Sequence, residues 1–139
     1  MPIMIDTSVW IDFFRGYATP QVARLKALIG EEDLLIGDLI LAETLQGIRD
    51  DHDVQRVEVA FAPYPVVPLV GGAIARQSAR YYRRLRKQGI TVRKTIDCLI
   101  ATWCIMHSVP LLHADRDFAP SSFRTPASHA SDPQFANTA

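Results

Sequence analysis

Five acidic residues of this chain stand where a globular domain usually places aliphatic side chains. Asp6 closes the apolar run 3–5, Glu43 interrupts the run that begins at Leu39, and Asp97 opens the run 98–106. Asp115 and Asp117 follow the run 109–113. Burying a carboxylate is costly unless a cation or several hydrogen-bond donors compensate its charge. Five such positions together indicate one shared partner, and a hard divalent cation is the partner that oxygen ligands favour.

The cysteines of the chain bear on which cation the acids bind. The two cysteines, Cys98 and Cys104, lie six residues apart in a predicted helix and point to different faces, so they form neither a disulfide nor a zinc pair. An all-oxygen ligand set favours Mg²⁺, with Mn²⁺ as a substitute, over zinc. Clustered carboxylates repel each other, which raises their pKa values unless such an ion neutralises them.

Each acid also has a purely structural explanation. Asp97 falls in the first turn of a predicted helix, where it complements the helix dipole. Asp115 and Asp117 suit a turn, and Asp6 suits a strand exit before a helix cap. Glu43 is the hardest to explain in this way, because no cation lies three or four residues from it on its helix.

The elements that must position these acids alternate along the chain. Buried apolar runs predict short strands, whereas helical spacing and capping residues such as Thr19 followed by Pro20 predict helices. The predicted helix after residue 50 begins at Asp51 or Asp53, and the next one ends before Gly89. We expect Ser8 near the start of its helix, and Asp38 and Thr95 as the N-caps of theirs. The predicted strands are 2–6, 34–37, 66–67 and 109–113, and the predicted helices are 8–15, 20–30, 38–49, 51–62, 70–88 and 95–108.

Short strands separated by helices predict an α/β fold. We expect a three-layer α/β/α sandwich with a central, mostly parallel, short-stranded sheet. One domain should span residues 1–125, with an edge strand near 122–124, and residues 126–139 should form a flexible tail. Ligands of such sheets lie beyond the carboxyl ends of the strands, so the acids should share one crevice.

Composition places the chain among ordinary globular proteins. Its 139 residues are 48% hydrophobic and 22% charged, which suits one domain with a real core. No apolar run approaches the roughly 20 residues that span a bilayer, and the N-terminus does not resemble a signal peptide. We therefore expect a soluble cytoplasmic protein without a membrane partner.

The charges are unevenly distributed although the net charge is +0. No acidic residue falls between Glu58 and Asp97, whereas eight basic residues do. Taken alone, this stretch is better explained as a solvated helix face. Beside a metal-binding acidic cluster it favours contacts with a phosphate backbone. The candidate RNA-binding residues are Arg80, Arg83, Arg84, Lys87, Arg93 and Lys94.

Four segments, in order along the chain, carry a resemblance to a known family. They are MIDTSVW at 4–10, LAE at 41–43, TIDCLIA at 95–101 and LLHADRDF at 111–118. Together they resemble the PIN-domain ribonucleases, and within these the VapC-type toxins of bacterial type II toxin–antitoxin pairs. The similarity covers about residues 1–118.

The resemblance implies specific roles for the acids and their neighbours. The implied catalytic residues are Asp6, Glu43, Asp97 and Asp115. The implied metal ligands are Asp6, Asp97, Asp115 and Asp117. Ser8, and with it Thr7, would support the site through hydrogen bonds.

The implied activity is Mg²⁺-dependent hydrolysis of RNA phosphodiester bonds by an endoribonuclease toxin that inhibits translation and growth. Transfer RNA is the substrate that the resemblance favours. The implied partners are the RNA substrate and a cognate VapB-type antitoxin, with a toxin homodimer inside a larger toxin–antitoxin assembly.

Other classes of function remain open. A haloacid-dehalogenase-type phosphohydrolase needs a second Asp two residues after the first, whereas position 8 is Ser. A flap-endonuclease-like DNA nuclease normally has insertions that this chain lacks. A non-catalytic domain that binds metal and RNA or a basic peptide would also use these acids. A nuclease assay with and without Mg²⁺ separates these classes.

Overall fold

The computed structural model describes residues 1–92 and 94–114 together with the backbone of a short strand at 135–136. The strands are β1 (Pro2–Ile5), β2 (Asp33–Gly37), β3 (Val66–Val67), β4 (Leu111–Leu112) and β5 (Phe135–Ala136). The helices are α1 (Thr7–Phe14), α2 (Pro20–Leu28), α3 (Asp38–Gln46), α4 (Asp51–Phe61), α5 (Gly72–Lys87) and α6 (Thr95–Met106).

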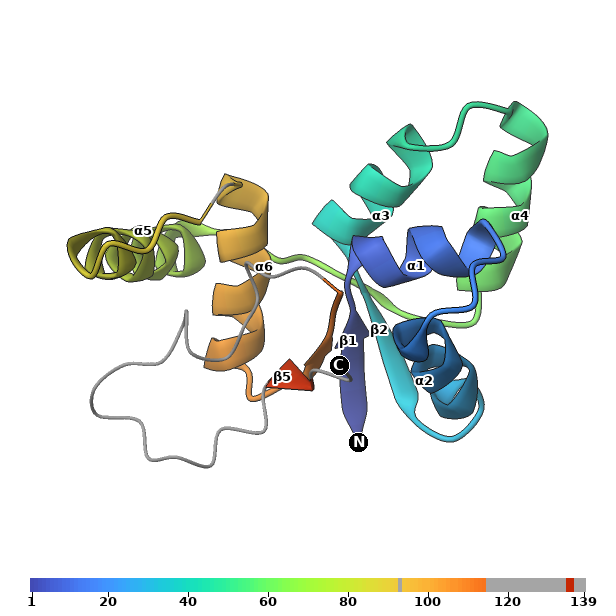
Figure 1. The fold of residues 1–139 in the computed structure, drawn as a ribbon, viewed down its shortest axis with the longest axis horizontal. Coiled ribbons are helices and arrows are strands. Elements are labelled where there is room, and N and C mark those ends of the chain that lie inside the picture. Colours follow the sequence, from blue (N-terminus) through green and yellow to red (C-terminus); the bar gives the residue numbers. More distant parts are fainter. Residues whose placement is uncertain (93, 115–134, 137–139) are drawn as a thin grey trace.

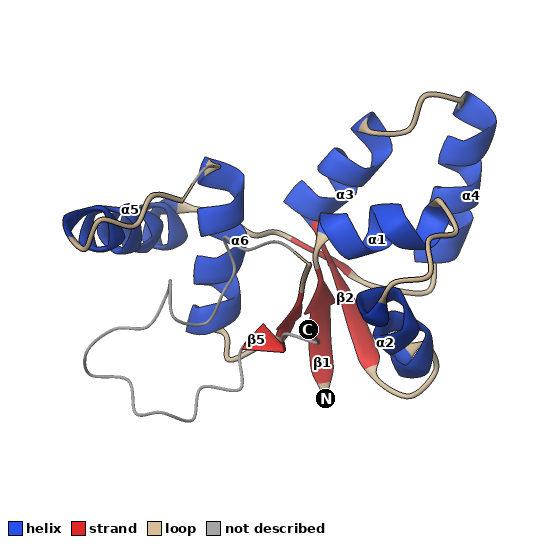
Figure 2. Ribbon diagram, viewed as in Figure 1, coloured by secondary structure: helices blue, strands red, loops and turns tan. Residues whose placement is uncertain are grey.

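The strands form one parallel sheet in the order β3-β2-β1-β4-β5. The central strand β1 places Met4 beside Leu35 of β2 and Leu111 of β4. Figures 1 and 2 show α5 and α6 on one side of the sheet and α1 to α4 on the other. The predicted three-layer α/β/α fold is therefore confirmed.

The core lies on both faces of the sheet. Met4 and Ile5 of β1 are fully buried, as are Ile100 and Cys104 of α6. This burial agrees with the apolar character of α6 around nearly its whole circumference. On the opposite face, the ring centroids of Trp10 and Phe61 lie 4.7 Å apart in an edge-to-face arrangement.

Local capping explains several helix starts. Thr19 caps α2 as predicted, because its hydroxyl accepts the Val22 N–H at 3.1 Å and Pro20 follows it. The first helix begins one residue earlier than predicted, at Thr7, since Asp6 rather than Ser8 is its N-cap. The expectation that Thr95 caps α6 was wrong, because the N-cap is Lys94 and Thr95 is already helical.

The prediction that Asp38 caps α3 was also wrong. Gly37 is the N-cap, and Asp38 is the first helical residue. The Asp38 carboxylate accepts the N–H of Leu39 at 2.8 Å and that of Leu69 at 3.1 Å. It therefore ties the start of α3 to the segment between β3 and α5, a long-range contact that outweighs the local capping preference.

The carboxyl-terminal part of the sheet includes one strand that the sequence did not predict. Phe135 and Ala136 of β5 pair with Leu111 and Leu112. The edge strand predicted at 122–124 and the rest of the predicted tail lie outside the described residues. Within the part of the chain that the structure describes, no helix has both the length and the apolar character to cross a bilayer.

Candidate active site

The order of the strands marks one edge of the sheet as the place for a ligand. The chain runs from β1 outward through β2 to β3, and then returns to the other side of β1 to form β4. The order thus reverses between β1 and β4, and open α/β sheets bind ligands at the carboxyl ends of the strands at such a point. Asp6 lies directly beyond β1, and its N–H donates to the Leu112 carbonyl of β4 at 2.8 Å.

A groove of about 320 Å³ opens at this position. It contains the acids from three different elements, Asp6 before α1, Glu43 of α3 and Asp97 of α6. Asp6 and Asp97 have only 4% and 5% of their surface exposed, whereas Glu43 is half-buried. The full lining is Asp6, Thr7, Ser8, Ile11, Glu43, Gln46, Gly47, Lys94 and Asp97.

Asp6 is an acid with a raised pKa. Burial raises its pKa from 3.8 to about 6, and the negative charge of Glu43 adds to this effect. Two hydrogen bonds oppose the rise in pKa, because Asp6 Oδ2 accepts the Ser8 hydroxyl at 2.6 Å and the Ser8 N–H at 3.2 Å. The side chain that caps α1 therefore carries a charge that the protein stabilises only in part.

Two further hydrogen bonds orient the groups around Asp6. The Thr7 hydroxyl donates to Glu43 Oε1 at 3.0 Å, which connects the first turn of α1 to α3. The N–H of Ala114 donates to the Ser8 oxygen at 3.4 Å. Ser8 thus connects Asp6 to the residue that precedes Asp115 in the sequence.

The two cysteines stay neutral beneath the groove. Burial raises the pKa of both thiols, and the Asp6 charge raises that of Cys104 further. Both side chains are free, as the sequence predicted, and the Cys98 thiol donates to the Ser78 carbonyl at 3.5 Å. Because a metal binds the thiolate form, neither cysteine suits a metal site here.

The basic residues named from the sequence do not all reach the groove. Lys94 lines it, whereas the four on α5, which are Arg80, Arg83, Arg84 and Lys87, do not. Arg83 instead lines a separate apolar pocket of about 410 Å³ between α5 and α6. The expected site residues Arg93, Asp115 and Asp117 lie outside the described residues.

Sequence reasoning missed two groove residues at the end of α3, the last helical residue and the C-cap. Gln46 and Gly47 lie three and four residues after Glu43, so they share its face of the helix. This spacing was the available signal. Gln46 adds an amide that can donate to a phosphate oxygen or accept from a water molecule.

The donor set of the groove fits a hard divalent cation. Its acids offer only oxygen ligands, and the raised pKa of Asp6 shows a charge that a cation would stabilise. Among residues 1–92 and 94–114, no three acidic, histidine or cysteine side chains lie close enough to form a complete metal site. Two of the four predicted ligands, Asp115 and Asp117, fall beyond those residues.

Comparisons with known proteins identify the family of this chain. The family model described as "PIN domain" matches residues 3–120. Ribonuclease VapC11 of Mycobacterium tuberculosis and a VapC ribonuclease of Mycobacterium bovis are each 34% identical over 118 residues. Each match covers 84% of this chain and 88% of the relative.

Solved structures support the fold. The chain superposes on VapBC2 from Rickettsia felis, solved with a promoter DNA fragment, with a TM-score of 0.73 at 15% identity, covering 99% of this chain and 98% of the other. A toxin–antitoxin complex from Klebsiella pneumoniae gives a TM-score of 0.69 at 18% identity with the same coverage. At these identities, the superpositions are evidence for the architecture alone.

Proposed function

This chain belongs to the PIN-domain family and, within it, to the VapC ribonucleases, and from that premise we propose that it is a Mg²⁺-dependent endoribonuclease toxin of a toxin–antitoxin pair. The observation that carries the proposal is the meeting of Asp6, Glu43 and Asp97 in one groove where the strand order reverses. Three separate elements contribute these acids, so ordinary capping does not explain all of them.

The metal ion would be held by Asp6 and Asp97, with Asp115 and Asp117 as the further ligands expected from the sequence. When bound, Mg²⁺ or Mn²⁺ supplies a water of lowered pKa and compensates the charge of the phosphate. Ser8 holds the Asp6 carboxylate in one orientation through its two hydrogen bonds. A fixed carboxylate is needed because a small misplacement of a ligand lowers the rate strongly.

Glu43 is suited to receive the proton of the attacking water. It is only half-buried, so water can reach it, and Thr7 holds one of its oxygens at 3.0 Å. The other oxygen remains available for that water. Lys94, on the rim, can bind a phosphate oxygen of the RNA during the same step.

The RNA backbone would extend from the groove toward α5. Arg80, Arg83, Arg84, Lys87, Arg93 and Lys94 form our proposed phosphate-binding set, because cations supply the sequence-independent part of RNA affinity. Arg80, Arg83 and Lys87 are exposed, and Arg84 lies over the Tyr81 ring at 6.0 Å from its centroid. Transfer RNA is the proposed substrate on the strength of the family resemblance.

The proposed partner is a VapB-type antitoxin with a basic segment. Its arginine would enter the acidic groove and compensate the charge that the metal compensates in the active enzyme. A toxin homodimer within a larger complex completes the proposal. The apolar pocket between α5 and α6, which contains Val70 and Leu99, offers an apolar surface for such association.

The decisive experiment compares Asp97→Asn with Asp51→Asn. Both residues lie in the first turn of a helix, but Asp51 is exposed and lies outside the groove. We expect Asp97→Asn to fold normally and to lose Mg²⁺-dependent RNA cleavage by at least about 100-fold. Asp51→Asn should cleave like the wild type.

Two results would contradict the metal mechanism: full activity of Asp97→Asn, or undiminished wild-type cleavage in excess chelator. Binding of RNA without turnover by the wild type in Mg²⁺ would favour a non-catalytic interaction domain instead. Expression of the wild type should also arrest growth, and co-expression of the antitoxin should restore it. Harmless expression of an active enzyme would argue against the toxin role.

A further inference from the structure

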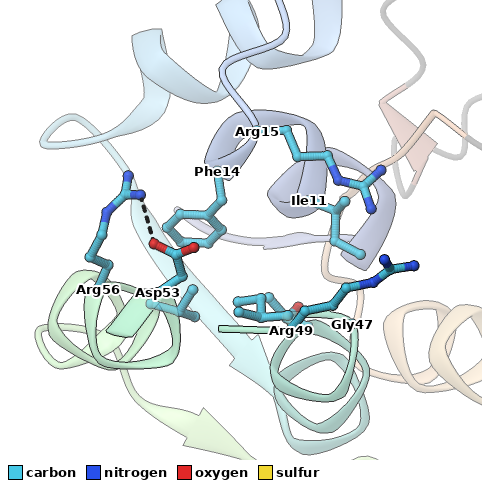
Figure 3. A pocket seen from close by; sticks show the side chains of 10 residues that line it. Ile11, Phe14, Arg15, Gly47, Arg49, Asp53 and Arg56 are labelled. Carbon is cyan, nitrogen blue, oxygen red and sulfur yellow. Dashed lines mark hydrogen bonds and ion pairs between the residues drawn. The ribbon is translucent and has the colours of Figure 1, made fainter. Parts of the chain in front are cut away.

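A second groove adjoins the acidic one. It has a volume of about 280 Å³ and lies between α1, α3 and α4 (Figure 3). Ile11 and Gly47 line both grooves, so the two adjoin at these residues. Phe14, Ile48 and Val57 give the second groove an apolar lining.

Two arginines of this second groove have no counter-ion within residues 1–92 and 94–114. Among the described residues, Arg56 pairs with Asp53 at 3.4 Å, whereas neither Arg15 nor Arg49 forms an ion pair. Both Arg15 and Arg49 are exposed. In Figure 3, Arg56 lies beside Asp53 on one side of the pocket, and the other two arginines extend on the opposite side. The groove therefore combines an apolar lining with two unneutralised cations.

We infer that the second groove binds the nucleotide next to the scissile phosphate of the RNA. Its base would lie against Phe14 and Ile11, and Arg15 and Arg49 would bind its phosphate. This inference rests on the proposed ribonuclease function and extends it by a binding site opposite the basic helix α5. The substrate would then be held on both sides of Asp6 and Glu43.

The size and chemistry of the groove favour this occupant. A volume of 280 Å³ is near the lower limit of small-ligand sites, which are roughly 300–1,000 Å³, so it suits one base. Bases stack on aromatic side chains and on guanidinium planes, and the guanidinium fork matches phosphate oxygens. Because the two grooves adjoin at Ile11 and Gly47, neighbouring nucleotides of one strand can reach both of them.

The test measures the salt dependence of RNA binding. The probe is a 5′-fluorescein-labelled 12-nucleotide single-stranded RNA of randomised sequence, bound without Mg²⁺ in an Asp97→Asn background that prevents cleavage. The double variant Arg15→Gln/Arg49→Gln is compared with Arg24→Gln/Lys26→Gln, which removes two exposed cations from α2. Fluorescence anisotropy gives Kd between 0.05 and about 0.3 M KCl, a range in which phosphate contacts dominate.

Loss of two phosphate contacts to single-stranded RNA should make the plot of log K against log salt less steep in the Arg15→Gln/Arg49→Gln protein. The expected change in slope is about 1.4, at about 0.7 per contact. If the two contacts contribute nothing to affinity near 1 M salt, the Kd of this double variant at 0.1 M salt should be about 25-fold higher than that of the parent protein. The α2 control should keep the wild-type slope. Equal slopes for the two double variants would overturn the inference.

Two further results distinguish a failure of the proposed ribonuclease function from a failure of the inferred nucleotide site. Wild-type protein that cleaves no RNA in Mg²⁺ contradicts the proposed function itself. An Arg15→Gln/Arg49→Gln protein with unchanged RNA affinity but weakened antitoxin binding would assign the groove to a protein partner, which overturns only this inference.

Discussion

Replacing Asp6 by Asn should stabilise the metal-free protein. The Asp6 pKa rises from 3.8 to about 6 because the charged form is buried, so its ionisation costs about 3 kcal/mol of folding free energy at pH 7, at 1.36 kcal/mol per pKa unit. Asparagine is neutral, and its side-chain oxygen can still accept the Ser8 N–H at the start of α1. We expect the Asp6→Asn protein to lack nuclease activity and to unfold with a free energy about 2–3 kcal/mol higher.

The sign of the pH dependence follows from the same pKa. Between pH 3.8 and about 6, the folded state binds more protons at Asp6 than the unfolded state, so this residue lowers stability as the pH rises. The cost is fully present above pH 6 and fades below it. The stability difference between variant and wild type should therefore fall from about 3 kcal/mol at pH 7 to about 1.5 kcal/mol at pH 5.

Urea denaturation in chelator at the two pH values measures this difference, and Asp50→Asn is the matched control. Asp50 is also a helix N-cap whose carboxylate accepts a backbone N–H, from His52 at 2.9 Å, but it is exposed. Its substitution should change stability by only a few tenths of a kcal/mol. Added Mg²⁺ should stabilise the wild type and leave Asp6→Asn nearly unchanged. An Asp6→Asn protein no more stable than Asp50→Asn at pH 7 would refute the reasoning.

Further predictions concern the hydrogen bonds around the acids. Ser8→Ala removes the 2.6 Å bond that lowers the Asp6 pKa, so the acidic limb of the pH–rate profile should move to higher pH; an unmoved limb would contradict this role. Thr7→Val releases one oxygen of Glu43 and should lower kcat about fivefold with little change in KM, since one hydrogen bond contributes about 1 kcal/mol. An equal rise in KM, measured by steady-state cleavage, would place Thr7 in substrate binding instead.

Local signals were sufficient to predict most of the elements. The apolar run that ends at Ile5 predicted β1, and the Thr19–Pro20 pair marked the start of α2. The start of α1 was harder to predict, because Asp6 and Ser8 are both good N-caps. The choice between Asp6 and Ser8 as the N-cap depends on where β1 ends, and that end is determined by the pairing of β1 with β4. The strand β5 gave no signal at all, since two residues are too few for a periodic pattern.

The convergence of the acids was predictable, whereas their surroundings were not. Asp6 follows the carboxyl end of a strand and Asp97 lies in the first turn of a helix, and these positions predict that both lie near one edge of the sheet. The partnership of Thr7 with Glu43 depends on how α1 packs against α3, two helices that are 36 residues apart at this contact. The adjacency of the two grooves depends on the same packing. Hydrophobic periodicity shows which face of a helix is buried, but it does not show which helix covers that face.

The net charge of the chain is +0, but the fold places acidic and basic side chains in different grooves. The acidic groove holds three carboxylates and one cation, Lys94, among its lining residues. In the part of the chain that the structure describes, Arg15 and Arg49 of the adjoining groove form no ion pair. On the proposed function, the flanking cations attract RNA, but the metal-free acids repel the phosphate that must lie between them. The burial of Asp6 strengthens this repulsion, because little solvent screens its charge. Compensation of the acids is therefore a condition for placing the scissile phosphate as well as for activating the water. Under the proposed function, an antitoxin arginine in the groove would compensate the same charge without supplying the chemistry, so one groove would serve both activity and inhibition.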